Sequence, residues 1–121
     1  MAERAKRTAS EQGRASREKG KRFERDIANF FKTYGITAKR TAQYCGKTGQ
    51  AGDVEGVPGI HVECKAVEKL NLEAAYQQSV RDAEAADKGE YPIVIHKKSR
   101  KPAMVTMALD DWIVMYLAWA R

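Results

Sequence analysis

The feature that most constrains the fold is a short stretch, residues 51–65, that reads as two strands joined by a Pro-Gly turn. In its second half, apolar and polar side chains alternate. Glu63 and Lys65 therefore point to one face of the strand, and Cys64 points to the other. If the two strands pair as a hairpin, Asp53 comes to lie beside Glu63. The stretch predicts a sheet with an apolar face against a core and a charged face that carries two carboxylates and a lysine.

This set of charges has a chemistry of its own. Two carboxylates offer the oxygen ligands that a hard divalent cation such as Mg²⁺ prefers, and a lysine adds a fixed positive charge beside the cation. That combination suits the hydrolysis of phosphodiesters. The alternative is an ordinary surface ion pair between Glu63 and Lys65, which would contribute little to stability.

The order of these residues resembles the PD-(D/E)XK nuclease motif. Asp53 is followed after ten positions by Glu63-Cys64-Lys65, and Glu24 stands in a Gly-x-x-Phe-Glu sequence on the first expected helix. This arrangement is similar to that of the archaeal-type Holliday junction resolvases and their phage relatives. The resemblance covers roughly Gly20 to Leu109, which is most of the chain.

The resemblance implies a fold, a metal centre and a reaction. The fold would be α/β, with a restriction-endonuclease-like mixed central sheet flanked by helices. The cofactor would be Mg²⁺, with Mn²⁺ able to substitute. The metal ligands would be the side chains of Asp53, Glu63 and Glu24 together with the backbone carbonyl of Cys64. Lys65 would orient the attacking water or stabilise charge on the phosphate.

A second helix, expected after an N-cap at Asn71, carries a further candidate. The family often places a glutamine on this helix near the metal, and Gln78 is the residue we expect there. Gln77 is its neighbour and rival. A solvent-facing amide is the alternative for both.

The net charge of +6 and the isoelectric point near 9.4 favour a polyanionic partner. We therefore expect DNA to bind, although a solvated basic turn is the alternative for the cluster after residue 96. The candidate DNA-binding residues are Arg40, Lys47, Lys97, Lys98, Arg100 and Lys101.

One departure from the resolvase pattern leaves the substrate open. The loop between Arg40 and Asp53 lacks the serine expected in the archaeal enzymes and offers Thr41, Cys45 and Thr48 instead. We expect a metal-dependent endonuclease that resolves four-way junctions. The alternatives are a phage-type nuclease for flaps, single strands or duplex ends, and a basic nucleic-acid-binding module without catalysis.

The expected order of elements is helix, three strands, helix, two strands, helix, within one nuclease domain over residues 20–121. Residues 1–19 are rich in charge and contain no large apolar side chain after Met1, which predicts a flexible basic arm or a loosely helical extension. The arm would either keep the protein in solution or lie along phosphates.

The last helix, from Leu109 onward, is apolar nearly all round and needs a cover on two sides. We expect a homodimer to supply the second cover; the alternative is that the strands and the first helix wrap it within one chain. No apolar run is long enough to cross a membrane, and no signal peptide is apparent. We therefore expect a cytoplasmic protein with reduced cysteines, encoded by a phage or by a prokaryotic host.

Overall fold

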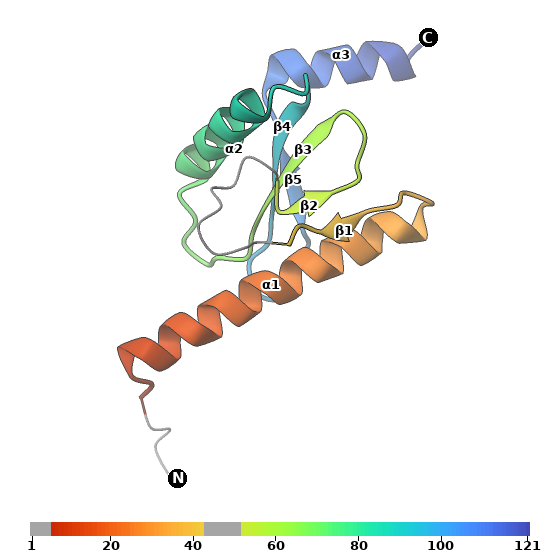
Figure 1. Ribbon diagram of the computed structural model, residues 1–121. Helices are drawn as coiled ribbons and strands as arrows, with labels where there is room; N and C mark the ends of the chain where they lie inside the picture. Colours follow the sequence, from red (N-terminus) through yellow and green to blue (C-terminus); the bar gives the residue numbers. More distant parts are fainter. Residues whose placement is uncertain (1–5, 43–51) are drawn as a thin grey trace.

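The computed structural model describes residues 6–42 and 52–121, and its elements follow the expected order (Figure 1). The elements are α1 (Ala9–Thr33), β1 (Lys39–Arg40), β2 (Val54–Glu55), β3 (Ile60–Lys65), α2 (Leu72–Ala86), β4 (Tyr91–His96), β5 (Met104–Thr106) and α3 (Leu109–Trp119).

The five strands form one mixed sheet in the order β1-β2-β3-β4-β5. Strands β3 and β4 are parallel, and the other three neighbouring pairs are antiparallel. The expected hairpin forms, with Val54 opposite Val62. Its turn contains Gly56 and Gly59, both with positive φ, and Gly56 also passes so close to the backbone of Thr37 that a side chain there would collide.

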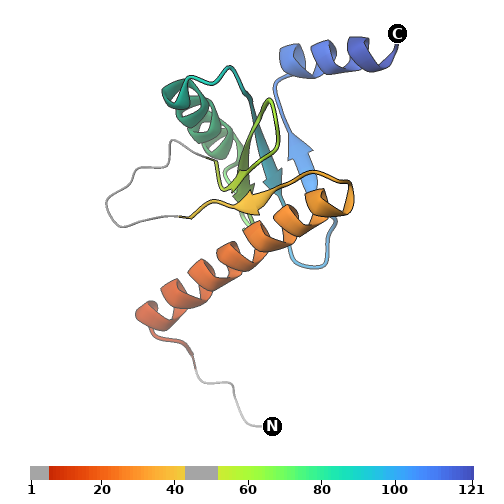
Figure 2. The same ribbon diagram turned by 45° about the vertical axis from the view of Figure 1, so that its right-hand side comes forward.

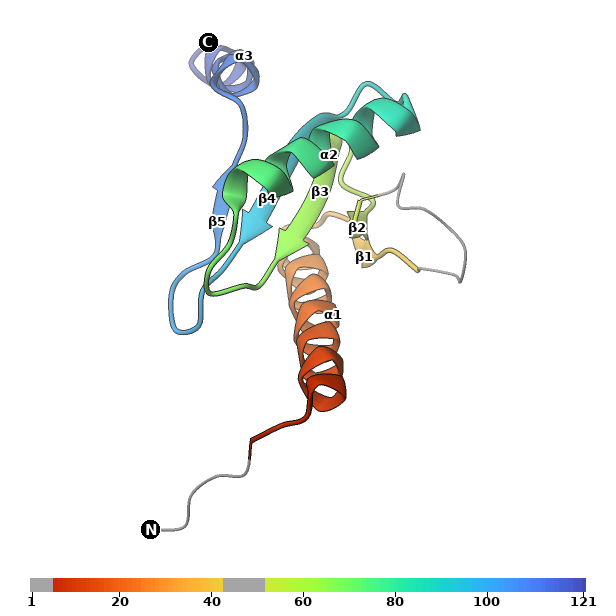
Figure 3. The ribbon, with the colours of Figure 1, turned by 90° about the vertical axis from the view of Figure 1, so that its left-hand side faces the viewer.

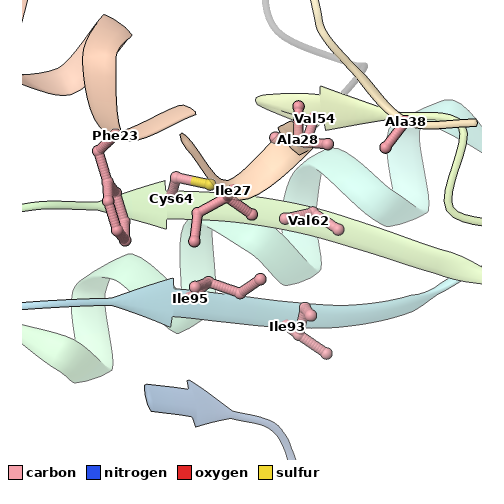
Figure 4. Packing of buried hydrophobic residues seen from close by; sticks show 9 residues of the cluster. All are labelled: Phe23, Ile27, Ala28, Ala38, Val54, Val62, Cys64, Ile93 and Ile95. Carbon is pink, nitrogen blue, oxygen red and sulfur yellow. The ribbon is translucent and has the colours of Figure 1, made fainter. Parts of the chain in front are cut away.

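Helices cover both faces of the sheet, and the hydrophobic core lies under α1 (Figures 3 and 4). Phe23 and Ile27 of α1 pack with the apolar face of β3, which includes Cys64, and with the neighbouring strand β4. On the opposite face, Ser79 of α2 is fully buried and its hydroxyl donates to the carbonyl of Ile93 at 3.0 Å. The alternation read from the sequence is confirmed, because the apolar side of β3 faces α1 and the polar side faces α2.

Helix α1 begins well before the position at which we expected a first helix. It starts at Ala9, and Thr8 caps it in a reciprocal pair with Glu11, in which each side chain accepts from the other residue's backbone N–H. The helical alternative for residues 1–19 therefore holds from Ala9 onward. Most of this extra length is exposed, so capping and good helix formers support it rather than core packing.

Helix α3 extends away from the sheet beyond β5 (Figures 1 and 2). None of its residues is buried, and Trp119 is 79% exposed. The alternative of a wrapping by strands and the first helix is therefore wrong for the described part of the chain. No helix in the described part is both long and apolar enough to span a membrane.

Candidate active site

Asp53 is fixed by three hydrogen bonds to backbone groups, two of them with β3 and one with Thr41, which follows β1. Its N–H donates to the carbonyl of Val62 at 2.7 Å, and its own carbonyl accepts from the N–H of Thr41 at 2.9 Å. Its Oδ2 accepts from the N–H of Cys64 at 2.8 Å. Gly52 permits this approach, because any side chain at that position would collide with the backbone of Val62. The hairpin therefore places the Asp53 carboxylate between the Glu63 and Lys65 positions, as expected.

Glu63 is almost fully buried, at 3% exposure, and it lies next to Asp53. The pKa of Glu63 is raised to about 7, chiefly by burial and also by the negative charge of Asp53, while a hydrogen bond with His61 lowers it. The neighbouring carboxylates of Asp53 and Glu63 suit a divalent cation. A bound cation would offset the repulsion between their two negative charges and would favour loss of the proton from Glu63.

Lys65 completes the polar edge of β3 and settles which glutamine faces it. Its Nζ donates to Oε1 of Gln78 at 3.3 Å, whereas Gln77 is exposed. The helix and the strand thus hold the ammonium group from one side. This contact orients the lysine, and it is the one hydrogen bond that the ammonium group makes within residues 6–42 and 52–121.

Glu24 reaches the same region from α1, although it also has a partner of its own. Its Oε1 accepts from Nε of Arg40 at 2.9 Å, in a pair that is largely shielded from solvent. Burial raises the pKa of Glu24, and the charge of Asp53 adds to the effect. Arg40 therefore lies near the carboxylates, as expected, but its first role is to hold Glu24 in position. Its contact with DNA remains a prediction.

The buried thiol of Cys64 lies near these charged residues. Its pKa is raised, first by burial and then by the charges of Asp53, Glu24 and Glu63, while Lys65 lowers it. The Cys64 thiol therefore lies in the combined electric field of the four residues. The Cys64 side chain belongs to the core, and metal binding by its backbone carbonyl stays a prediction.

A second grouping around Glu63 was not foreseen from the sequence. His61 is 2% exposed, and its Nε2 lies 3.0 Å from Oε1 of Glu63. Together with Asp82 of α2, these two residues offer ligand atoms within 4.8 Å of one another, an arrangement that could also hold a metal ion. The sequence contained one signal, because Asp82 follows Gln78 by four residues and so shares its helix face. Glu63 belongs to both groupings.

The candidate DNA-binding residues divide into three cases. Lys47 lies outside the described residues. Arg40 is paired with Glu24. The cations of the turn between β4 and β5 are Lys97, Lys98, Arg100 and Lys101. This turn is joined to β3, because the N–H of Lys97 donates to the carbonyl of Lys65 at 3.0 Å.

Comparison with known proteins adds a family and a fold. Residues 15–120 match the family described as "Phage putative PDDEXK endonuclease". A solved structure with a similar fold is that of Archaeoglobus fulgidus Hjc, a Holliday junction resolvase from an archaeal hyperthermophile. The TM-score is 0.54 at 22% sequence identity, over 73% of this chain and 76% of that chain. No curated protein matches the sequence. The likeness to Hjc confirms the restriction-endonuclease-like α/β fold.

Proposed function

Because this chain belongs to the phage PDDEXK endonuclease family, we propose that it is a Mg²⁺-dependent DNA endonuclease that resolves four-way junctions. The observation that carries the proposal is the position of Asp53, whose Oδ2 accepts from the N–H of Cys64 at 2.8 Å, between Glu63 and Lys65 on β3. A solvated surface patch would leave these carboxylates apart and exposed, whereas Glu63 is buried beside Asp53.

The side chains of Asp53 and Glu63 would hold the cation, with the carbonyl of Cys64 and with Glu24 bound directly or through water. All four donors are oxygen atoms, which favours Mg²⁺, and Mn²⁺ would substitute for it. A bound cation would lower the pKa of a water molecule and offset the charge that builds on the phosphate.

The remaining residues act on the water and the phosphate. In the reaction, a water oxygen attacks phosphorus, one P–O bond to a sugar breaks, and the leaving sugar oxygen takes a proton. Lys65, held by Gln78, directs its free N–H groups at the attacking water or at the charged phosphate oxygens. Arg40 keeps Glu24 aimed at the centre.

The preference for four-way junctions has its own support. Hjc, which has a similar fold, is a Holliday junction resolvase. The loop that lacks the expected serine favours the wider class of phage nucleases that cut flaps, single strands or duplex ends. We also infer that the protein acts in the cytoplasm, where its proposed substrate lies.

A panel of labelled DNA substrates tests the proposal. We expect cleavage of a four-way junction at low nanomolar protein in Mg²⁺, and none in EDTA. Stronger cleavage of flaps or duplex ends than of four-way junctions would replace the resolvase assignment by that of a phage-type nuclease for such ends and flaps. DNA binding without cleavage of any substrate in Mg²⁺ or Mn²⁺ would leave only a nucleic-acid-binding module.

We further propose that the active form is a homodimer joined through α3. A four-way junction must be cut on two strands, and each chain supplies one centre. Helix α3 carries an exposed row of aromatic rings, with Trp112 and Tyr116 stacked at 5.2 Å and Trp119 beside them at 5.9 Å from Tyr116. Such a row suits a self-complementary interface with aromatic anchors.

A further inference from the structure

A basic hollow of about 190 Å³ lies between α1 and the turn that joins β4 to β5, which in Figure 2 descends beside α1. Lys19 and Arg22 of α1 form one side, and Lys97 and Lys98 of the turn form the other. Asp26 is the carboxylate in its lining. Two elements far apart in sequence thus bring four cations around one small volume.

The four cations that line this hollow form no ion pairs with carboxylates in the described part of the chain. Among residues 6–42 and 52–121, none of these four cations has a carboxylate within 4.0 Å, whereas Lys21, Lys39 and Arg40 each have one. Unpaired cations that face one another across a hollow repel one another. An anion placed between them would relieve that repulsion.

The turn is held in place by hydrogen bonds from its backbone. The N–H of Ser99 donates to both carboxylate oxygens of Glu68, at 2.8 and 3.2 Å, and the N–H of Lys97 donates to the carbonyl of Lys65 at 3.0 Å. These anchors use backbone N–H groups. The ammonium group of Lys97 makes one long hydrogen bond, to the carbonyl of Lys98 at 3.4 Å, and within the described residues the ammonium group of Lys98 has no hydrogen-bond partner. The hydrogen bonds from Ser99 lower the pKa of Glu68, and the charges of Lys19 and Lys98 lower it further.

The hollow adjoins the catalytic centre. Its lining includes Phe23, which precedes Glu24 on α1, and Ala66, which follows Lys65 at the end of β3. Ala66 contributes only a methyl group and so leaves room there. We infer that this hollow seats one backbone phosphate of the DNA, close to the phosphodiester that is cut. The inference rests on the proposed function and adds to it the residues that fix the DNA strand in register.

A double-mutant cycle across the hollow tests the inference. Arg22→Gln and Lys98→Gln, singly and together, change one exposed residue on each side, so the fold should be unaffected. Binding to a labelled four-way junction is measured in EDTA over a range of KCl concentrations. We expect the salt slope to fall by about 0.9 in the double variant, the value for one lost phosphate contact. The second substitution should cost less than the first, because both residues serve the same phosphate.

Lys32→Gln with Arg81→Gln is the matched control, because it removes two exposed cations that do not line the hollow. Its salt slope should stay that of the wild type. A fall of about 1.8 with additive losses would mean two separate phosphates and would overturn the single seat. An unchanged slope in the Arg22 and Lys98 double variant would overturn the site altogether.

Neutral methylphosphonate linkages locate the phosphate relative to the cut. We expect one linkage close to the cut at which the substitution weakens binding by the wild type, and at which the double variant is insensitive. Equal sensitivity of both proteins at every linkage would contradict the inference. A wild-type chain that binds DNA through this hollow but cuts none would refute the proposed nuclease and leave the phosphate seat standing.

Discussion

The hairpin of β2 and β3 and the C-terminal helix α3 both depart from the usual distribution of buried apolar and exposed charged side chains. At the hairpin, charged groups are buried: Glu63 is 3% exposed, and the Asp53 carboxylate is bonded to the strand. In α3, apolar groups are exposed, including Trp112 and Trp119. Buried charge and exposed apolar surface are both costly in an isolated chain. Each region therefore points to something that the chain binds, a cation in the first case and a protein surface in the second.

The largest effect on activity is expected when one carboxylate of the hairpin is neutralised. Asp53→Asn should reduce cleavage by about 10²–10³-fold or more, since it removes a proposed metal ligand. DNA binding should stay equal or become tighter, because a negative charge that faces phosphates is lost. Asp82→Asn is the matched control from the second grouping and should retain most of the activity. Both are followed by single-turnover cleavage and by filter binding.

The outcome separates the two groupings around Glu63. If Asp82→Asn loses cleavage and Asp53→Asn keeps it, the cation belongs with His61 and Asp82, and our assignment of the centre is wrong.

The next largest effect should appear at α3. Trp112→Ser with Tyr116→Ser should weaken self-association by at least about thirtyfold, the equivalent of the ~2 kcal/mol of one hot-spot residue. The free energy of unfolding of the monomer should change little, because α3 buries none of its residues within the chain. Sedimentation equilibrium measures the association. Tyr34→Ser, another exposed aromatic residue, is the control.

A wild-type protein that stays a monomer of 13.6 kDa at micromolar concentration, yet cuts both strands of a junction at once, would contradict the dimer. Equal association of the variant and the wild type would instead place the interface elsewhere.

The raised pKa of Glu63 makes cation binding depend on pH. The cation needs the ionised carboxylate, so Mg²⁺ affinity should fall by about tenfold between pH 8 and pH 6, on either side of the pKa of about 7. Isothermal titration calorimetry in buffers of different ionisation enthalpy should also detect a released proton. An affinity that does not change over this range would mean that Glu63 is already ionised without metal.

The same shift has the opposite consequence for the metal-free protein. A carboxyl group whose folded pKa is raised from 4.5 to about 7 contributes stability below pH 4.5, and this contribution is lost as the pH rises through 7. The free energy of unfolding in EDTA should therefore fall by on the order of 1–3 kcal/mol from pH 5 to pH 8. Glu63→Gln should flatten this dependence in urea denaturation.

The smallest effect should come from Gln78. Gln78→Ala removes a hydrogen bond to the lysine ammonium and should lower the cleavage rate about three- to tenfold, with little change in cation affinity. The adjacent Gln77→Ala, at an exposed position, should behave as the wild type. Equal rates for the two variants would mean that the contact with Lys65 has no part in catalysis.

The hairpin could be predicted because its signals are local. Three signals lie within residues 51–65: the strict alternation from Ile60 to Lys65, the Pro-Gly turn and the position of Asp53. Because side chains of a strand point alternately to its two faces, the alternation fixes which residues face the core. The N-cap of α2 at Asn71 was predicted for the same reason, and its side chain accepts from the N–H of Ala74 at 3.0 Å.

Features that depend on the packing of distant elements could not be predicted from local sequence patterns. The approach of Asp82 to His61 requires the separation between α2 and β3, which no local pattern supplies. The early start of α1 is a different case, since Thr8 and Glu11 form a recognisable capping box that the low hydrophobicity of residues 1–19 obscured. The all-round apolar pattern of α3 indicated that other protein surface should pack against this helix. It did not indicate that the rest of the chain leaves the helix exposed.

The location of the cation is the most direct test of the proposed centre at the hairpin of β2 and β3. Crystals soaked in Mn²⁺ and measured at the manganese edge would show its position by anomalous scattering. We expect a peak bound by the carboxylates of Asp53 and Glu63, beside the ammonium group of Lys65. A peak held by His61 and Asp82 without Asp53, or no peak in a protein that cuts DNA in Mn²⁺, would contradict the proposed centre.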